Sequence, residues 1–293
     1  MNYSIVKNRI KSMPPFPKSI LELLGIISGD YDLSDIVKTI ECDGVLSGKI
    51  ISFSNKAIFA QREEVVSLTK ALALLGEKNI VSIAMGCLGS SHLNSDLEGY
   101  DAQEDSFWNH SLMVAILSRI LAKKSKISIN PNFAYTSGLL HDLGKSIISD
   151  SVSEILSGEP DDFDQYEIAK KLEESMKNFS FEEGFLELEK KITGFSHTEI
   201  GEILAKDWGL PEGFRQVMAF HHCPMESNKE YRNLVFIVHL ADYLTMCFGS
   251  STGADQFKYN LDKNYLDYIS LAEEDIDKIL LQADEELHLL QEN

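Results

Sequence analysis

The chain lacks the features that define several classes of protein. It has no run of about 18 uncharged apolar residues, the length that a membrane-spanning helix requires. Its first residues, from Met1 to Arg9, contain no apolar core followed by a small-residue cleavage site, so they do not resemble a secretory signal. It also has no internal repeat and no low-complexity segment. We therefore expect a cytoplasmic protein with no membrane partner.

Cysteines and basic residues are both scarce. The chain has 4 cysteines in 293 residues, and none is in a CxxC spacing, which argues against a disulfide framework and against a thiolate zinc site. We expect reduced, mostly buried thiols at Cys42, Cys87, Cys223 and Cys247. There are 27 Lys and Arg residues against 46 Asp and Glu, which gives a net charge of -19. Because phosphate contacts need clustered Lys and Arg, we expect no nucleic-acid partner.

What the chain does have is apolar residues at helical spacing. Ile20, Leu23, Leu24 and Ile27 follow the i, i+3, i+4, i+7 pattern of one helix face, and similar short patterns recur along the chain between polar breaks. The alternation typical of strands is rare. The content of 44% hydrophobic and 25% charged residues is that of an ordinary soluble protein. The sequence therefore predicts an all-α fold of many helices.

Several helix ends are marked by local signals. Ser19 after a proline is a candidate N-cap, and Ser196 with Glu199 three residues later fits a capping box. Asp43-Gly44 ends one helix, and Gly76 lies just past the end of another.

A polar, acidic stretch over residues 89–105 separates the chain into two halves. We predict an N-terminal helical subdomain at residues 1–100, packed on a C-terminal helical domain at residues 101–293. The second half contains an acidic segment at about 150–193, with a helical patch around Ile168, Leu172 and Met176. This segment is either a solvated insertion or a lid over a site, and its composition fits both.

The most informative stretch is Ser137-Gly-Leu-Leu-His141-Asp142-Leu-Gly-Lys145. It places an imidazole beside a carboxylate at the end of an apolar helix expected over residues 133–140. Such a pair could be a metal site, a general base with its orienting carboxylate, or a satisfied core pair, because charged groups inside a fold need partners. The choice depends on whether the rest of the chain supplies further ligands.

Further histidines and a carboxylate occur at helix ends and on apolar helices of the second half. They are His110, His197, His221, His222 and Asp242. Imidazole and carboxylate together suit divalent ions, with iron or manganese favoured and zinc or nickel as alternatives. Asp142 can offer one oxygen to each of two ions, and paired ions can clamp a phosphoryl oxygen and activate a water. The sequence therefore predicts a site for one or two divalent ions.

The order His110, His141-Asp142, Asp242 resembles the H…HD…D signature of the HD superfamily of metal-dependent phosphohydrolases. By this resemblance, these four residues would hold the first ion. If the protein is an enzyme, the expected catalytic residues are Asp142 and Lys145, which lies one turn beyond Asp142 on the same side of a short helical segment. Lys145 would place its ammonium on a substrate phosphate or bind a carboxylate ligand, and the competing interpretation is a solvated lysine.

His197 and the His221-His222 pair extend the similarity to the HD-GYP cyclic-dinucleotide phosphodiesterases. The resemblance implies that Asp142 bridges to a second ion held by these three histidines. However, the Gly-Tyr-Pro loop that follows the paired histidines in those enzymes is missing, since the chain continues as Cys223-Pro-Met-Glu-Ser. This departure argues against a cyclic-dinucleotide substrate. We expect His239 to support the site or pack in the core rather than bind an ion.

The resemblance to the HDOD family is closer and covers nearly the whole chain. Its marks in the first half are Pro14-Pro15-Phe16-Pro17, Asp43, Ser54-Asn55 and Ser67…Ala71…Leu75-Gly76. Its marks in the second half are Phe107-Trp108-Asn109-His110-Ser111, Gly138 to Lys145, and His197…Trp208-Gly209-Leu210-Pro211…His221-His222. We expect both tryptophans to lie in the core. The family implies a multi-helix architecture and a signalling or regulatory module.

Two functions remain open. The first is an HDOD-type regulator whose metal site is structural or sensory and which binds a signalling protein. The second is a metal-dependent phosphohydrolase acting on a nucleotide or phosphodiester, so that its partner is a small phosphate-containing ligand. Many HDOD proteins have lost part of the HD ligand set, whereas this chain retains all of it, which keeps the second function open.

Overall fold

The structure is a computed structural model, described for residues 3–56, 65–92, 97–100, 102, 105–157, 170, 184–250, 252–253, 255 and 258–291. Within these residues all regular elements are helices, which confirms the predicted all-α fold. They are α1 (Tyr3–Ser12), α2 (Lys18–Ile27), α3 (Leu33–Glu41), α4 (Gly44–Ser54), α5 (Leu68–His92), η2 (Glu98–Tyr100), α6 (Ser106–Ala122), α7 (Pro131–Leu140), α8 (Gly144–Ser157), α10 (Phe185–Thr193), α11 (His197–Asp207), α12 (Glu212–Phe220), η3 (Pro224–Glu226), α13 (Arg232–Cys247), α14 (Tyr265–Tyr268) and α15 (Glu273–Gln291). None of these described helices combines the length and apolar content that crossing a bilayer would require.

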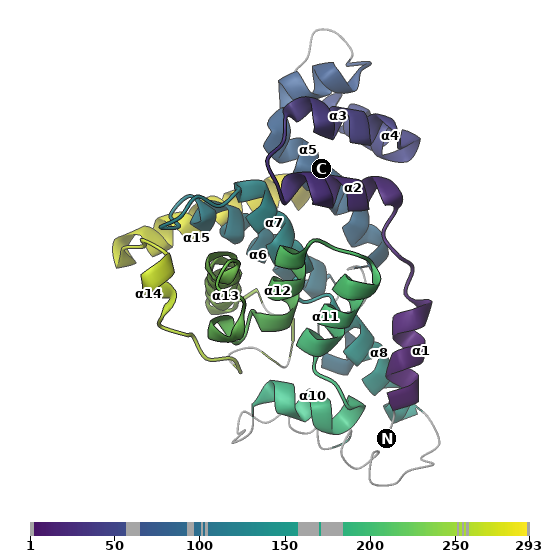
Figure 1. Cartoon of the computed structure of the whole chain (residues 1–293), viewed down its shortest axis with the longest axis vertical. Coiled ribbons are helices and arrows are strands. Elements are labelled where there is room, and N and C mark those ends of the chain that lie inside the picture. Colours follow the sequence, from purple (N-terminus) through teal and green to yellow (C-terminus); the bar gives the residue numbers. More distant parts are fainter. Residues whose placement is uncertain are drawn as a thin grey trace.

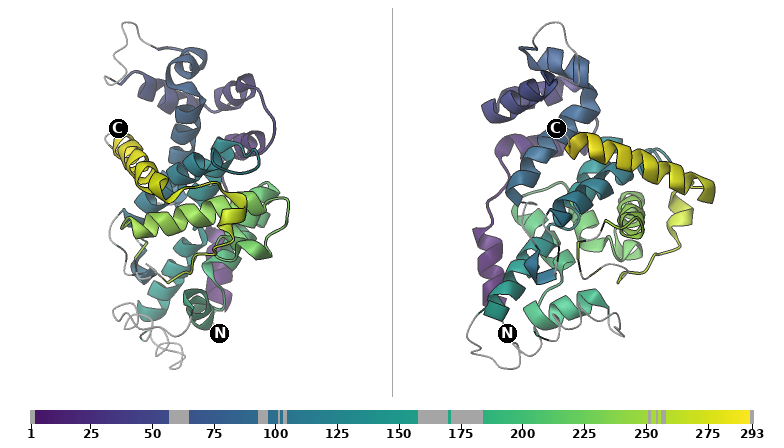
Figure 2. Two further views of the ribbon diagram at one scale, coloured as in Figure 1. Left: turned by 90° about the vertical axis from the view of Figure 1, so that its left-hand side faces the viewer. Right: turned by 180° about the vertical axis from the view of Figure 1, so that it is seen from behind.

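Helices from the first half of the chain lie at both ends of the molecule. Figure 1 shows α2 to α5 stacked at one end, while α1 lies near the other end beside α8. The rear view in Figure 2 shows the same separation. Arg9 of α1 pairs with Asp150 and Glu154 of α8, at 3.4 and 2.8 Å. The predicted division of the chain near residue 100 stays a prediction.

The centre of the second half is α6, which is buried along most of its length between α7, α13 and α15. The closest approach is to α7 at Gly138. A Cβ there would lie 2.7 Å from Ser118 Oγ and 2.9 Å from the Val114 carbonyl oxygen, so only glycine fits. Because Gly138 lies three residues before His141, this contact fixes the end of α7 that carries the His-Asp pair.

Several local signals lie where the sequence places them. Ser196 caps α11 in a capping box with Glu199, and Gly76 interrupts α5 with a φ of 74°. One expectation is wrong. Ser19 does not cap α2, because the chain enters that helix at Pro17. Asp43 does more than end α3, since its carboxylate caps α4 by accepting from two backbone N–H groups and also accepts from Ser19 Oγ at 2.6 Å.

The expectation of mostly buried thiols is wrong for the cysteines whose side chains are described. Cys42, Cys223 and Cys247 are exposed and form no disulfide. Each lies at or just beyond the end of a helix, where the chain leaves the core. The absence of a disulfide framework at these positions agrees with the prediction.

The acidic segment predicted at about 150–193 is described only at its ends. Its first residues continue α8, and its last residues form α10. The predicted helical patch around Ile168, Leu172 and Met176 lies outside the described residues. The choice between a solvated insertion and a lid depends on the same part of the chain, so both interpretations stay predictions.

Arg119 of α6 connects the C-terminal helix α15 to the core through an ion pair. Arg119 is 3% exposed, and its guanidinium donates to Ser82 Oγ at 3.1 Å and pairs with Glu286. We expect Arg119→Met to lower the free energy of unfolding by about 3 kcal/mol, because it leaves the largely buried Glu286 carboxylate without this partner. Urea denaturation monitored by circular dichroism measures this loss. Lys124→Met removes the more exposed pair with Asp275, which also attaches α15, and should change stability little. Equal losses in both variants would contradict the prediction.

Candidate metal centre

The structure brings all seven ligands expected from the sequence together in the interior. They form two groups, within each of which one ligand atom per residue lies within 4.8 Å of the others. We call them the Asp142 group, with Asp142, His197, His221 and His222, and the Asp242 group, with His110, His141 and Asp242. These residues come from α6, α11 and α13 and from the ends of α7 and α12, so the centre ties five helices together.

Asp142 lies between the two groups and presents one oxygen to each. Its Oδ1 is 3.4 Å from Nε2 of both His197 and His221. Its Oδ2 is 3.2 Å from His141 Nε2 and 3.6 Å from His110 Nε2. A carboxylate that bridges two ions needs this division of its oxygens.

Asp242 completes the second group from α13. Its Oδ1 lies 3.2 Å from His110 Nε2 and 3.8 Å from His141 Nε2. Its Oδ2 lies 3.9 Å from Nδ1 of His222 in the other group. The two groups therefore share one continuous cluster of nitrogen and oxygen atoms.

Four of the histidine rings are held from outside the cluster, so that Nε2 points inward. Nδ1 of His110, His141 and His221 lies 2.9, 2.7 and 3.1 Å from the carbonyl oxygens of Ser250, Gly138 and Val217, respectively. The fourth ring, His197, is held by Glu189 instead. Such outer partners fix the tautomer and orientation of a metal-binding histidine.

Several atoms of the cluster are buried and have no hydrogen-bond partner. They are Nε2 of His110 and His141, Oδ1 of Asp142, and both ring nitrogens of His222. Each such atom costs about 1–3 kcal/mol if it stays unsatisfied. One ligand atom of each of these residues lies within the two groups, so cations bound there would satisfy those atoms, and the donor set fits a divalent ion.

The charges of the cluster also favour cations. Four carboxylates within it are at most 3% exposed, while the only buried lysine that contacts them in the described chain is Lys145. The carboxylates are Asp142, Glu189, Asp242 and Asp255. Burial alone would raise the pKa of Asp142, but His141 and Lys145 hold it well below its usual range, so this carboxylate is ionised. One or two divalent ions would offset this excess of buried negative charge.

Lys145 is buried and paired, so the interpretation of a solvated lysine is wrong. Its Nζ lies 2.6 Å from Asp142 Oδ2 and 2.5 Å from Asp255 Oδ2, and it donates to Thr252 Oγ1 at 2.9 Å. Burial would lower the pKa of Lys145, but the surrounding carboxylates, Asp142 first, raise it above its usual value. The ammonium is therefore charged, and it is bound by Asp142, Asp255 and Thr252.

Three further residues of the centre are marked by no motif in the sequence. Glu189 belongs to the acidic segment, and Asp255 and Tyr259 follow α13 without a motif. Tyr259 stacks on His222 with 3.6 Å between ring centroids. Only Glu189 had a detectable signal, since it lies on the apolar face of α10 with Phe185, Leu188 and Ile192, which are all buried.

His239 lies outside both groups and supports them. Its Nδ1 lies 2.7 Å from the His221 carbonyl oxygen, and its Nε2 accepts from the backbone N–H of Asp262 at 2.9 Å. This agrees with the predicted supporting or core role. Trp108 and Trp208 are partly buried and pack against the core, as predicted.

Two cavities near these helices differ in their relation to the centre. One of about 330 Å³ borders His222 and is lined by four glutamates and one lysine. The glutamates are Glu187, Glu199, Glu202 and Glu226, and the lysine is Lys190. A second cavity, of about 1040 Å³, is larger but includes none of the seven ligands.

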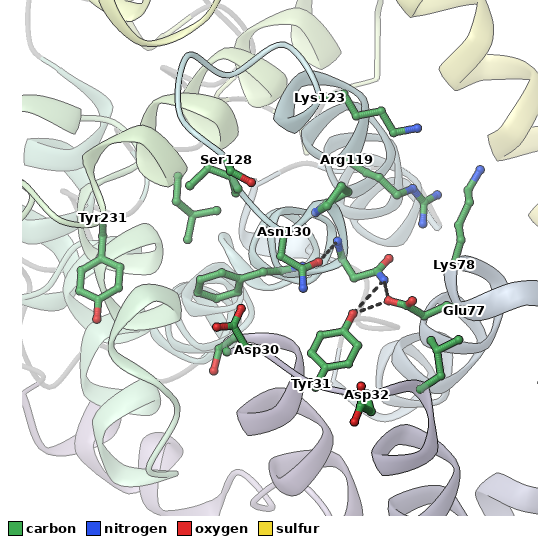
Figure 3. Close-up of a pocket in the computed structure, with 18 of the residues that line it drawn as sticks. Asp30, Tyr31, Asp32, Glu77, Lys78, Arg119, Lys123, Ser128, Asn130 and Tyr231 are labelled. Carbon is green, nitrogen blue, oxygen red and sulfur yellow. Dashed lines mark hydrogen bonds between the residues drawn. The ribbon is translucent and has the colours of Figure 1, made fainter.

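The larger cavity lies between the α2–α3 loop, α5 and the α6–α7 connection (Figure 3). Figure 3 shows Asp30 and Asp32 on one side and Lys123 on the other. Tyr31 and Asn132 both donate to Glu77. These mixed, partly self-paired charges favour no one kind of ligand, so we place the functional site at the metal centre despite the smaller space there.

The histidines of the metal-free centre differ in charge. Burial would lower the pKa of His141, but Asp142 and Asp242 outweigh it and raise this pKa to about 10. Burial together with the neighbouring His141 and His197 lowers the pKa of His221 to about 4. Burial and nearby histidines also lower the pKa of His222 well below its usual value. At neutral pH His221 and His222 are ready to bind an ion, whereas His141 must first lose a proton.

An ion that binds the Asp242 group should therefore release about one proton at pH 7.5. Calorimetric titration with Mn²⁺ in buffers of different ionisation enthalpy counts that proton, and the affinity should rise about tenfold per pH unit below pH 10. In the metal-free protein the raised pKa of His141 also stabilises the fold. This stabilisation is fully present below about pH 6.5, the usual pKa of histidine, and it is lost as the pH rises towards 10. Binding without proton release would contradict the assignment.

Comparison with known proteins identifies related sequences and folds. Residues 13–224 match the family model described as the HDOD domain. An uncharacterized protein of Treponema pallidum (strain Nichols) is 25% identical over 257 residues, which are 87% of this chain and 46% of that protein. The chain thus spans about half the length of the curated relative that it matches.

Two solved structures share the fold. A candidate signal transduction protein from Marinobacter aquaeolei VT8 has a TM-score of 0.69 and 19% identity, covering 98% of this chain and 64% of that one. A candidate phosphohydrolase from Shewanella amazonensis SB2B has a TM-score of 0.55 and 21% identity, covering 98% and 94%. At such identities the likeness concerns the fold alone.

Proposed function

This chain belongs to the HDOD family, and from that premise we propose that it is a regulatory signal-transduction protein controlled by a divalent-metal centre. The ligands would be those of the Asp142 and Asp242 groups. Bound ions would neutralise the buried carboxylates and hold the ends of five helices in one arrangement. The occupancy of the centre would then set the rigidity of the second half of the chain.

The observation that carries this proposal is the enclosure of the centre. The side chains of all seven ligands are at most 4% exposed. Catalytic metal sites keep a position open for water and substrate, whereas structural sites are closed. Here Lys145, the group best suited to a substrate phosphate, is already held by Asp142 and Asp255.

The acidic cavity beside His222 supports the same function. Four glutamates against one lysine give its walls an excess of negative charge. Such a wall attracts divalent cations and repels phosphate-containing substrates. The cavity therefore suits exchange of the ion better than entry of a nucleotide.

The partner that we propose is a signalling protein bound by the N-terminal helices. The first half of the chain forms α2 to α5, a helical layer that an HD-type metal centre does not itself need. The likeness to the Marinobacter protein, a candidate for signal transduction, supports this choice for the chain.

The alternative is a metal-dependent phosphohydrolase that acts on a nucleotide or phosphodiester. It is favoured by Asp142, which presents one oxygen to each of two ligand groups. It is also favoured by the likeness to the candidate phosphohydrolase from Shewanella amazonensis. The missing Gly-Tyr-Pro loop after His222 argues against cyclic dinucleotides as its substrates.

One experiment separates the two functions. Manganese- and iron-loaded protein and its Asp142→Asn variant are assayed against nucleotides, cyclic dinucleotides and an aryl phosphodiester, and the metal content of each is measured. We expect bound ions in the wild type, a rise in Tm on loading, and no turnover above that of the variant. A substrate that the wild type hydrolyses faster would establish the alternative, and wild-type protein without ions would overturn both.

A further inference from the structure

His197 differs from the other inward-pointing histidines in what holds its ring. Backbone carbonyls hold His110, His141 and His221, whereas a carboxylate holds His197. Both oxygens of Glu189 lie 2.9 Å from His197 Nδ1, and Oε2 also accepts from the His197 backbone N–H at 2.8 Å. Glu189 therefore fixes both the ring and the first residue of α11.

Glu189 is itself held in place. It is 2% exposed, and Tyr100 donates to its Oε1 at 2.5 Å. Tyr100 is also buried, and its ring centroid lies 5.7 Å from that of Phe185 on the same helix as Glu189. No lysine or arginine of the described ranges pairs with Glu189. A buried carboxylate with this environment needs a cation, and the nearest place for one is on the opposite nitrogen of the His197 ring.

We propose that Glu189 is a positioning residue that makes the Asp142 group the tighter of the two ion sites. This inference rests on the proposed metal centre. A carboxylate that accepts the Nδ1–H of a histidine orients the ring and makes Nε2 a stronger donor to the ion than a neutral carbonyl does. The acidic cavity borders His222 of the same group, so an entering ion also meets this group first.

Titration of the metal-free, full-length protein with Co²⁺ tests the order of binding. The visible absorption of protein-bound Co²⁺ should rise in two phases, the tighter one from the Asp142 group. Asp242→Asn should weaken the second phase and thereby assign it. Glu189→Gln, which keeps the size of the side chain and removes its charge, should weaken the first phase about 10- to 100-fold and leave the second unchanged.

Two further variants keep the test specific. Glu22→Gln removes a charge from α2 at a side chain that is 46% exposed and lies outside the acidic cavity, and it should titrate as the wild type does. Tyr100→Phe removes the hydrogen bond to Glu189 but keeps the carboxylate, so it should weaken only the first phase, by a smaller factor. It also serves if Glu189→Gln does not fold, which thermal unfolding of the metal-free variants reveals.

The outcomes separate this inference from the proposed function. Wild-type protein that takes up no Co²⁺ would overturn the metal centre and this inference with it. Two phases in the wild type with an unchanged first phase in Glu189→Gln, or equal weakening of both phases, would overturn only the role of Glu189. With an unfolded Glu189→Gln, an unchanged first phase in Tyr100→Phe would do the same.

Discussion

Asp142→Asn should reduce the metal content of the protein from two ions per chain to at most one. The substitution takes a charged oxygen from each ligand group, because Asp142 faces His197 and His221 with one oxygen and His141 with the other. Loss of a partner that only supports a ligand costs roughly 10- to 100-fold in affinity, so loss of a shared ligand should cost more. An ion at 100 times its Kd stabilises a protein by about 2.7 kcal/mol, and the variant should lose this stabilisation.

Elemental analysis after gel filtration and thermal unfolding with and without chelator measure both effects. The matched control is Asp150→Asn, which removes an aspartate from α8 at a half-exposed pair with Arg9. The control should keep both ions and the rise in Tm on metal loading. If Asp142→Asn bound as much metal as this control, Asp142 would not be a shared ligand.

Gly144→Ala should lower the free energy of unfolding by about 2–4 kcal/mol. A Cβ on Gly144 would overlap the carbonyl oxygen of His197 and lie 3.0 Å from the backbone nitrogen of Gly201. Both obstacles are backbone atoms of α11, so the clash is relieved only if α8 and α11 move apart. Such a movement would also pull His197 away from Asp142, and metal affinity should fall together with stability.

Urea denaturation of the metal-free protein isolates the steric part of this loss. Gly48→Ala is the control, because a Cβ at that position inside α4 meets nothing within 4 Å. Alanine is the better helix residue there, so the control should be unchanged or more stable by about 0.5–1 kcal/mol. Equal stability of the two variants would show that α8 and α11 tolerate a wider spacing than the structure has.

Features that depend on a few neighbouring residues could be predicted from the sequence. The capping box of Ser196 and Glu199 and the break at Gly76 are of this kind. The clustering of the ligands was also predictable, since the order of histidines and aspartates along the chain indicates it. His141-Asp142 alone does not indicate a metal site, because an isolated His-Asp pair is also stable as a base with its orienting carboxylate or as a satisfied core pair.

Contacts between distant segments could not be predicted. Lys145 is buried because Asp255 and Thr252, more than a hundred residues later, fold over it. Glu189 lies in the acidic segment, and its apolar neighbours on α10 indicate burial but not that its carboxylate accepts from His197. In both cases only the tertiary structure supplies the partner that a buried charged side chain needs.

The two ends of α8 meet very different surroundings. Its first turn carries Lys145 into the metal centre, whereas its later turns carry Asp150 and Glu154 to Arg9 of α1 at the surface. A helix of 14 residues is a stiff rod about 21 Å long. If ion binding shifts the buried end of α8, we therefore expect α1 to move with it, and a fluorescent label on α1 should change its signal when ions bind in the interior.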